Sequence, residues 1–489
     1  MNSADVVASL PLVIVPATSI AVMIAIAVRR NHEVAAGLSL LGLLAALGSL
    51  PFAASALPRQ VTTLLILDSY ALFYIGLLVG AAAFVLVFAF DYLKSWPGRR
   101  EEFYILVLLA TTGSMVLAVS RHFASLFLGL ELLSVALYAL IAYLRTGSAA
   151  IEAGIKYLVL AASSSAFLLF GLALIYAESG SMELSQFAPA MRSTSLDSLP
   201  LLTGLLLVLT GVGFKLAIVP FHLWTADVYE GALLPVTAFI ATVSKGGMFA
   251  LILRWFYVPN LGPDLGPDLG PDLGVVGAPG LVLSMIAVAS MLAGNLLALR
   301  QDNLKRILAF SSIAHMGYLL VALLAGGHLG ATAATYYLAA YLVTILGAIG
   351  ILTVLSNSRH EAAAMDAYQG LYWRRPVVAG AFTVMLLSLA GIPLTAGFLG
   401  KFYVIAAGAS QARWVLLLTL VATSTIGLFY YLRIIVAMYA QPLVPDELHP
   451  SLPLPTAMAL AVLVGLVLLL GVYPAPLWAA IQAMTRHLG

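Results

Sequence analysis

Four ionisable residues lie deep inside runs that are otherwise apolar. They are Glu131 in FLGLELLSVALYAL, Lys215 and Lys245 in the stretch that begins at Gly211, and Lys401 in SLAGIPLTAGFLGKFYV. A lysine at the centre of a bilayer costs about 2.5 to 3.5 kcal/mol on insertion scales, so such residues are seldom kept without a role. Because proton relays are a common use of buried carboxylates and amines, we predict that these four residues form one.

A relay of this kind depends on two opposing effects on proton affinity. Burial disfavours the ammonium form of a lysine, whereas a carboxylate nearby favours it. Making and breaking the interaction between Glu131 and Lys215 would therefore move a proton onto or off the lysine. The alternative is a static pair that only staples two helices together. That alternative is weaker for Lys245 and Lys401, which have no carboxylate in their own runs.

Two histidines add groups that titrate near neutrality. His222 follows Pro220 in PFHLW, and His315 lies in SSIAHMGYLL. We treat both as candidate linkers of the relay, with a hydrogen-bonded core histidine as the alternative reading of each. Asp227 and Glu230, in TADVYEG, either mark the mouth of the path or cap a turn.

The composition is that of an integral membrane protein. Of 489 residues, 62% are hydrophobic and 9% are charged, whereas soluble domains carry about 25% charged residues. The apolar runs are about 20 residues long, enough for a helix to cross a hydrocarbon core of roughly 30 Å, and they do not alternate as strands of a barrel would. The absence of cysteine excludes thiolate-bound iron–sulfur clusters, disulfides and cysteine catalysis, and no ATP-binding motif is found.

The elements that must position the relay are about fourteen transmembrane helices, so we predict an all-α polytopic membrane protein. The first run lacks a basic segment before it and is expected to be a retained helix. The predicted spans lie near residues 8–28, 35–55, 64–90, 103–120, 123–144, 154–177, 200–221, 233–256, 279–299, 306–326, 332–356, 376–407, 413–440 and 455–483.

Basic residues set the expected orientation, because short cytoplasmic loops are enriched in lysine and arginine. The loops after odd-numbered spans are the richer set, with residues such as Arg29, Arg99, Arg300, Lys305 and Arg374. We therefore expect those loops in the cytoplasm and both chain termini on the outer side.

Two spans are interrupted, the seventh around Pro220 and the twelfth around Gly391 to Pro393, and each interruption lies near a buried lysine. Paired broken helices in corresponding positions indicate inverted repeats with a site at mid-membrane. We expect N-terminal helices 1–3 over residues 1–102, a first five-helix repeat over 103–256, a second over 279–440, and helix 14 over 455–489. The odd number of helices in each repeat inverts the second copy.

The tandem GPDLGPDLGPDLG, from Gly262 to Gly274, falls in a loop predicted on the outer side. Proline and glycine at this frequency prevent a regular helix, so a flexible linker is expected. A calcium loop built on Asp264, Asp268 and Asp272 is the alternative, but the EF-hand pattern is not met.

Three segments carry a family resemblance: PFHLWTADVYEGALLPVTAFIATVSK, QDNLKRILAFSSIAHMGYLLVALLAG and GIPLTAGFLGKFYV. They resemble the antiporter-like subunit N of bacterial respiratory complex I, the NADH–quinone oxidoreductase, and the stretch that ends in SK is closer to N than to the related subunits L and M. The resemblance implies fourteen helices, broken helices 7 and 12, and a relay of Glu131, Lys215, Lys245 and Lys401. The GPDL repeat is not part of the family pattern.

The same resemblance implies that flavin, iron–sulfur clusters and quinone are bound by partner subunits and that this chain holds no cofactor or metal. It implies subunits M and K as neighbours, the bacterial cytoplasmic membrane as location, and no nucleic acid. The chain would belong to an enzyme without carrying out redox chemistry itself. A cation/proton antiporter subunit of the same fold and a purely structural membrane anchor are the alternative functions.

Overall fold

The computed structural model describes residues 2–96, 98–143, 147–184, 198–257, 278–356, 361–441 and 452–485. Within these ranges thirteen helices are long and apolar enough to cross a membrane, and the two shorter apolar helices α16 and α17 together supply one more crossing. The predicted all-α membrane fold is confirmed. The GPDL repeat lies outside the described residues.

The first half of the chain contains one small hairpin and otherwise helices. In order these are α1 (Ser3–Val28), α2 (His32–Ala54), β1 (Arg59–Gln60), β2 (Ile66–Leu67), α3 (Ser69–Lys94), α4 (Glu101–Val119), α5 (Phe123–Ile141), α6 (Ser148–Ser179), α8 (Leu199–Leu216), α9 (Thr225–Gly231), α10 (Leu234–Phe239), the π-helical turn η1 (Ile240–Ser244) and α11 (Lys245–Tyr257). Strands β1 and β2 pair antiparallel, with Arg59 opposite Leu67.

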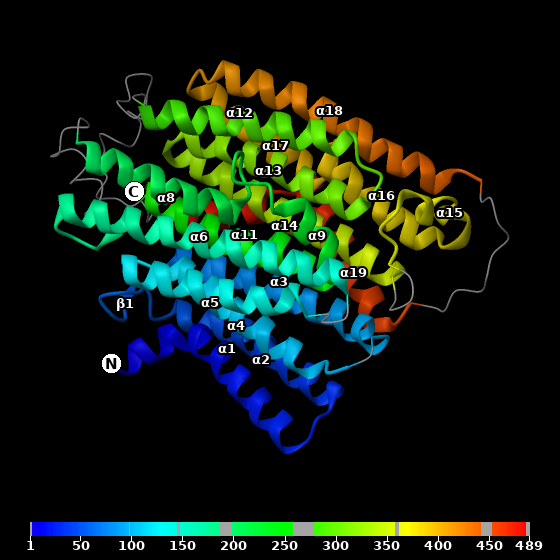
Figure 1. Ribbon diagram of the computed structural model, residues 1–489, viewed down its shortest axis with the longest axis horizontal. Coiled ribbons are helices and arrows are strands. Elements are labelled where there is room, and N and C mark those ends of the chain that lie inside the picture. Colours follow the sequence, from blue (N-terminus) through cyan, green and yellow to red (C-terminus); the bar gives the residue numbers. More distant parts are fainter. Residues whose placement is uncertain are drawn as a thin grey trace.

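The second half is helical over its described residues. Its elements are α12 (Ala278–Leu299), α13 (Leu304–Ala325), α14 (Gly327–Leu355), the 3₁₀ turn η3 (Met365–Tyr368), α15 (Leu371–Arg374), α16 (Pro376–Ala390), α17 (Ala396–Ser410), α18 (Trp414–Tyr439), α19 (Leu454–Val472) and α20 (Ala475–Thr485). The long helices lie roughly parallel, and both termini are at the same end of the bundle (Figure 1).

Helices α13 and α14 occupy the middle of the bundle. In the apolar part of each span, 94% of the residues of α13 and 83% of those of α14 are buried within the protein, against 28% in α1. Polar side chains on α13 and α14 are therefore shielded from lipid. Helix α14 packs against α3, α10, α13, α16, α17 and α19. Residues on α14 can therefore meet groups from both halves of the chain.

Both predicted interruptions are confirmed. Helix α8 ends at Ala217, which has a left-handed φ of 60°, and the chain then runs through Pro220 before α9 begins. Helix α16 ends at Gly391 with φ 86°, and Leu394 has φ 70° before α17 begins. Left-handed backbone is costly for residues other than glycine, and such strain is concentrated at functional sites.

Several span boundaries differ from the prediction, and two of these differences have a clear physical cause. The third span does not begin near residue 64, because residues 59–67 form the hairpin; α3 begins at Ser69 after Asp68, whose carboxylate accepts from the N–H of Ala71. The last span is not continuous to residue 483, because Pro474 cannot donate the next helical hydrogen bond, and a separate helix α20 follows.

Candidate functional site

In the first repeat, α5 and the last turn of α8 bring together the residues around Lys215. Its side chain is buried, with 3% of the residue exposed, and its Nζ donates to Ser134 Oγ and to Tyr157 OH, both at 3.1 Å. Ser134 is one turn from Glu131 on α5. The lysine is thus held by hydroxyl groups from α5 and α6.

Glu131 does not touch Lys215 directly. Of the ion pairs within 4.0 Å between described residues, none includes Glu131, and its Oε1 is buried without a hydrogen-bond partner among them. A rigid staple through a direct salt bridge is therefore not what joins these helices.

Lys245 is the first residue of α11 and is fully buried. It directly follows the π-helical turn, a feature that often marks functional sites and that the sequence analysis did not anticipate. Its Nζ donates to Ser312 Oγ on α13 at 2.7 Å, and Ser312 Oγ is 2.5 Å from Tyr341 OH on α14. The lysine of the first repeat is thereby connected to two helices of the second.

His315 lies on α13, three residues after Ser312 and so on the same face of the helix. It is buried, with Nδ1 2.6 Å from Tyr337 OH and Nε2 3.3 Å from Tyr431 OH. The Tyr431 hydroxyl also bonds to Ser311. Ser312, which binds Lys245, lies one turn before His315, and Lys401 lines the same pocket as His315. The structure therefore places His315 near two of the predicted relay lysines.

Lys401 reaches back from α17 to the broken end of α16. Its Nζ donates to the main-chain oxygens of Leu389, at 3.0 Å, and Ala390, at 2.8 Å, and to Ser424 Oγ at 2.7 Å. The last carbonyls of a helix have no partner within it and carry the negative end of its dipole, so they suit a cation. Gly391 permits this approach, since a Cβ there would lie 2.9 Å from Lys401 Cδ.

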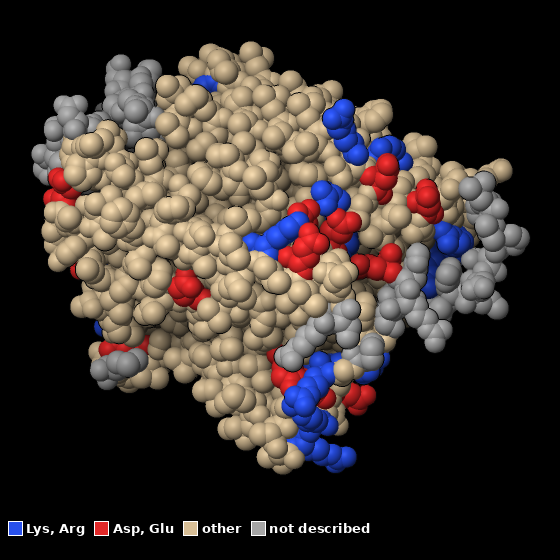
Figure 2. Space-filling view, in the orientation of Figure 1, with Lys and Arg blue, Asp and Glu red and all other residues tan. Residues whose placement is uncertain are grey.

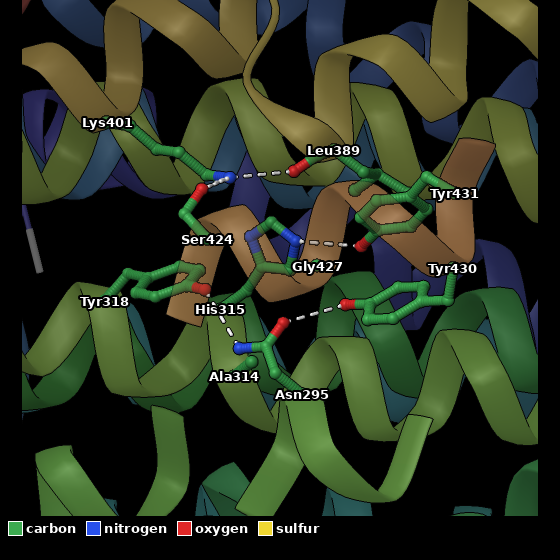
Figure 3. Close-up of a pocket in the computed structure, with 10 residues that line it drawn as sticks. All are labelled: Asn295, Ala314, His315, Tyr318, Leu389, Lys401, Ser424, Gly427, Tyr430 and Tyr431. Atoms are coloured by element: carbon green, nitrogen blue, oxygen red, sulfur yellow. Dashed lines mark hydrogen bonds between the residues drawn. The ribbon is translucent and has the colours of Figure 1, made fainter. Parts of the chain in front are cut away.

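His315 and Lys401 line one small pocket (Figure 3). Its empty volume is about 150 Å³, part of which is open to the surroundings, and it has no space for a water molecule. The side chains around it converge from α12, α13, α17 and α18, and they include Asn295, Tyr318, Ser424, Tyr430 and Tyr431.

His222 lies apart from this constellation. It sits in the break between α8 and α9, half-buried, and its Nδ1 has no hydrogen-bond partner among the described residues. No hydrogen bond found in the described part of the chain joins it to Glu131 or to the three lysines. Of the two candidate linkers, the structure brings only His315 among the lysines.

Asp227 and Glu230 belong to an ion-pair network. Asp227 binds Lys156 at 2.8 Å and Arg306 at 3.0 Å, and Glu230 binds Arg306 at 2.7 Å. Lys305, beside Arg306 on α13, is 1% exposed and donates to two main-chain oxygens near the end of α9 as well as to a carboxylate. The network ties α6 and α9 of the first repeat to α13 of the second.

The sequence analysis missed the hydroxyl and amide groups that surround the charged residues. Ser134, Ser312 and Ser424 are the direct partners of the three lysines, and Asn295 is a buried amide on α12. Serines are ordinary in transmembrane helices, so only their spacing from charged residues, as for Ser134 after Glu131, offered a signal.

The chain matches the family model described as NADH:quinone oxidoreductase/Mrp antiporter, transmembrane, over residues 120–427. It is 47% identical over 483 residues to NADH-quinone oxidoreductase subunit N of Ectopseudomonas mendocina (strain ymp), covering 96% of this chain and 94% of the relative.

Two solved structures are similar along almost the whole chain. A chain of respiratory complex I from Thermus thermophilus with bound aureothin has a TM-score of 0.81 and 32% identity, covering 97% of this chain and 100% of that chain. A chain of the Mrp complex from Dietzia sp. DQ12-45-1b has a TM-score of 0.84 and 21% identity, covering 100% and 98%, and this likeness concerns the fold alone.

Proposed function

Because the chain belongs to the NADH:quinone oxidoreductase/Mrp antiporter family of membrane subunits, we propose that it translocates protons as subunit N of a bacterial NADH–quinone oxidoreductase, respiratory complex I. Electron transfer would take place in partner subunits that bind flavin, iron–sulfur clusters and quinone. This chain would contribute only the movement of protons.

The observation that carries the proposal is the kind of partner that each buried lysine has. Lys215, Lys245 and Lys401 come from three different crossings, and each donates to at least one side-chain hydroxyl rather than to a carboxylate. A hydroxyl both donates and accepts. When a lysine releases its proton, the hydroxyl can turn and donate to the neutral amine, so the hydrogen bond is kept in either charge state.

In this proposal Glu131 controls the first lysine through space. A carboxylate in direct contact would hold the proton on Lys215, because it stabilises only the ammonium form. At a greater separation, a small movement of α5 relative to α8 changes the interaction without breaking a salt bridge. The order of groups is then Glu131, Lys215, Lys245, His315 and Lys401, and a linker role for His222 stays a prediction.

The distribution of charged residues on the surface supports an orientation of the chain in the membrane. Most lysines and arginines visible in Figure 2 lie toward the end of the helices opposite the termini, which supports cytoplasmic placement of that end and outer placement of both termini. We place the chain in the bacterial cytoplasmic membrane with subunits M and K as neighbours, and we retain residues 103–256 and 279–440 as its two inverted repeats.

Lys245→Ala in the intact complex tests the function. The purified complex, reconstituted into vesicles, should translocate fewer protons per NADH oxidised, whereas NADH oxidation in the presence of an uncoupler should continue. Lys94→Ala is the matched control, because that lysine is exposed at the end of α3 and should not alter the ratio. An unchanged ratio for Lys245→Ala would reject the assignment.

Two further measurements separate the alternatives. If the combined replacement of Lys215, Lys245 and Lys401 left pumping unchanged in an assembled complex, the chain would be a structural anchor. If vesicles exchanged protons for sodium without NADH or quinone, and potassium did not substitute, a cation/proton antiporter would be the better description.

A further inference from the structure

We propose that Asn295 is a positioning residue, which fixes the ring of Tyr318 against His315 and Lys401 and thereby keeps the step between these two groups closed. The inference rests on the proposed function, because it identifies the side chain that controls one step of the same relay. It concerns an amide that carries no charge and cannot itself take part as an acid or base.

Asn295 is buried on α12, with 1% of the residue exposed, and all its polar atoms are engaged. Its Nδ2 donates to the main-chain oxygen of Met291 at 2.8 Å and to Tyr318 OH at 3.0 Å, and its Oδ1 accepts from Tyr430 OH at 3.1 Å. An amide offers two donors and one acceptor group, so this set of partners fixes its orientation. Figure 3 shows the amide joining the two phenols beneath the pocket.

A glycine on helix α18 leaves room for this amide. Gly427 lies directly against it, and a Cβ at that position would be 2.8 Å from Asn295 Oδ1. Any side chain at Gly427 would therefore push the amide away from its partners. The amide is thus held by α12, α13 and α18 together.

The ring of Tyr318 lies close to both relay groups, and among the described residues no hydrogen bond joins its hydroxyl to either. The ammonium of Lys401 is 5.3 Å from the ring centroid, and the imidazole of His315 meets the ring edge to face at 5.5 Å. The hydroxyl is held by Asn295 and, at 3.5 Å, contacts Thr423. Asn295 therefore engages the only polar atom of this side chain in a hydrogen bond outside the relay.

The step between His315 and Lys401 is closed in this arrangement. Among the described residues no hydrogen bond joins the two groups, and the pocket has no space for a water molecule. A proton needs a water or a hydroxyl to bridge such a gap, and in our proposal a movement of Tyr318, whose ring lies close to both groups, makes room for one. That movement breaks its hydrogen bond to Asn295, and a buried hydrogen bond of this kind shifts the population of the closed state roughly two- to tenfold.

Asn295→Leu and Tyr318→Phe, each in the intact complex in vesicles, test the inference. Both variants lose the hydrogen bond, but Tyr318→Phe keeps the ring. We expect passive proton leak under an imposed pH gradient, without NADH, to rise roughly two- to tenfold in both. The number of protons translocated per NADH should fall. The double variant should leak no more than either single variant, and Asn295→Gln should restore part of the closure.

Thr111→Val on α4 is the matched control, since this buried hydroxyl bonds only to its own helix and should leave leak unchanged. If Asn295 only supports packing, Asn295→Leu will lower the melting temperature while Tyr318→Phe leaks no more than the parent, and the inference is overturned. Should Asn295→Leu not assemble, Tyr318→Phe decides alone. Failure of the function itself is recognised separately, because Lys401→Ala would then pump normally.

Discussion

The sharpest stability prediction concerns a buried ion pair between the start of α3 and the end of α11. Arg254 donates to both carboxylate oxygens of Asp68, at 2.8 Å and 2.9 Å, and its Nε donates to the main-chain oxygen of Ala118 at 3.0 Å. The side chains are 5% and 17% exposed, respectively, and the guanidinium lies 4.7 Å from the ring of Tyr70. This pair fixes the far end of the helix that begins with Lys245.

Asp68→Asn leaves the guanidinium buried with a neutral partner. Removing one member of a buried ion pair typically costs 3–5 kcal/mol, and because asparagine keeps one acceptor we expect about 3 kcal/mol. Replacing both residues, as Asp68→Asn with Arg254→Met, removes the uncompensated charge and should recover more than half of that loss. The assay is thermal unfolding of the purified complex in detergent, with the exposed-pair variant Glu102→Gln as a control that should change little.

The pH dependence of this contribution has a definite sign. Burial by itself raises the pKa of Asp68, but the guanidinium of Arg254 and the N–H of Ala71 outweigh it, so the pKa lies below its ordinary value. The unfolded state then binds a proton more readily, and the pair stabilises the fold fully above about pH 4. The stability difference between the parent and Asp68→Asn should be constant near neutrality and shrink as the pH falls below about 4. A difference that grew on acidification, or a cost equal to that of Glu102→Gln, would refute the reasoning.

Two other predictions address the second repeat and its link to the first. Gly391→Ala should impair pumping and lower the free energy of unfolding by about 1–3 kcal/mol, because the position has φ 86° and the new Cβ would lie 3.1 Å from Lys401 Nζ. Thermal unfolding and proton translocation measure the two effects, and a variant that behaves like the parent in both would contradict the prediction. Lys305→Met should lower stability by about 3 kcal/mol, since it leaves Glu361 and the main-chain oxygens near the end of α9 without their cation, whereas Lys94→Met should not.

Much of the fold was predictable because a membrane restricts the possibilities. Apolar runs of about 20 residues can only be crossing helices, and proline or glycine near a buried lysine marks a broken one. The breaks at Pro220 and Gly391 lie where they were expected. The relationship to subunit N of complex I, expected from three motifs, is confirmed by 47% identity over 96% of the chain.

The local surroundings of the charges were not predictable, because they depend on contacts between helices distant in sequence. The partners of Lys245 and His315, Ser312 and Tyr431, lie 67 and 116 residues away along the chain. No periodicity within one helix reveals such pairs. Likewise, the apolar pattern before Lys245 fits an α-helix and a π-helical turn equally well, since the two differ only in which carbonyl each N–H reaches.

The two broken helices differ in the position of the lysine relative to the break. Lys215 precedes its break, two residues before Ala217, and among the described residues its hydrogen-bond partners are side-chain hydroxyls. Lys401 follows its break, and two of its three partners are main-chain carbonyls at the end of α16. Carbonyls at the end of a helix favour a cation, so Lys401 loses this electrostatic stabilisation when it releases its proton, whereas the hydroxyl partners of Lys215 suit either charge state. The two lysines should therefore differ in how readily each releases its proton, and a pump needs that asymmetry if protons are to move one way along groups that repeat in the fold.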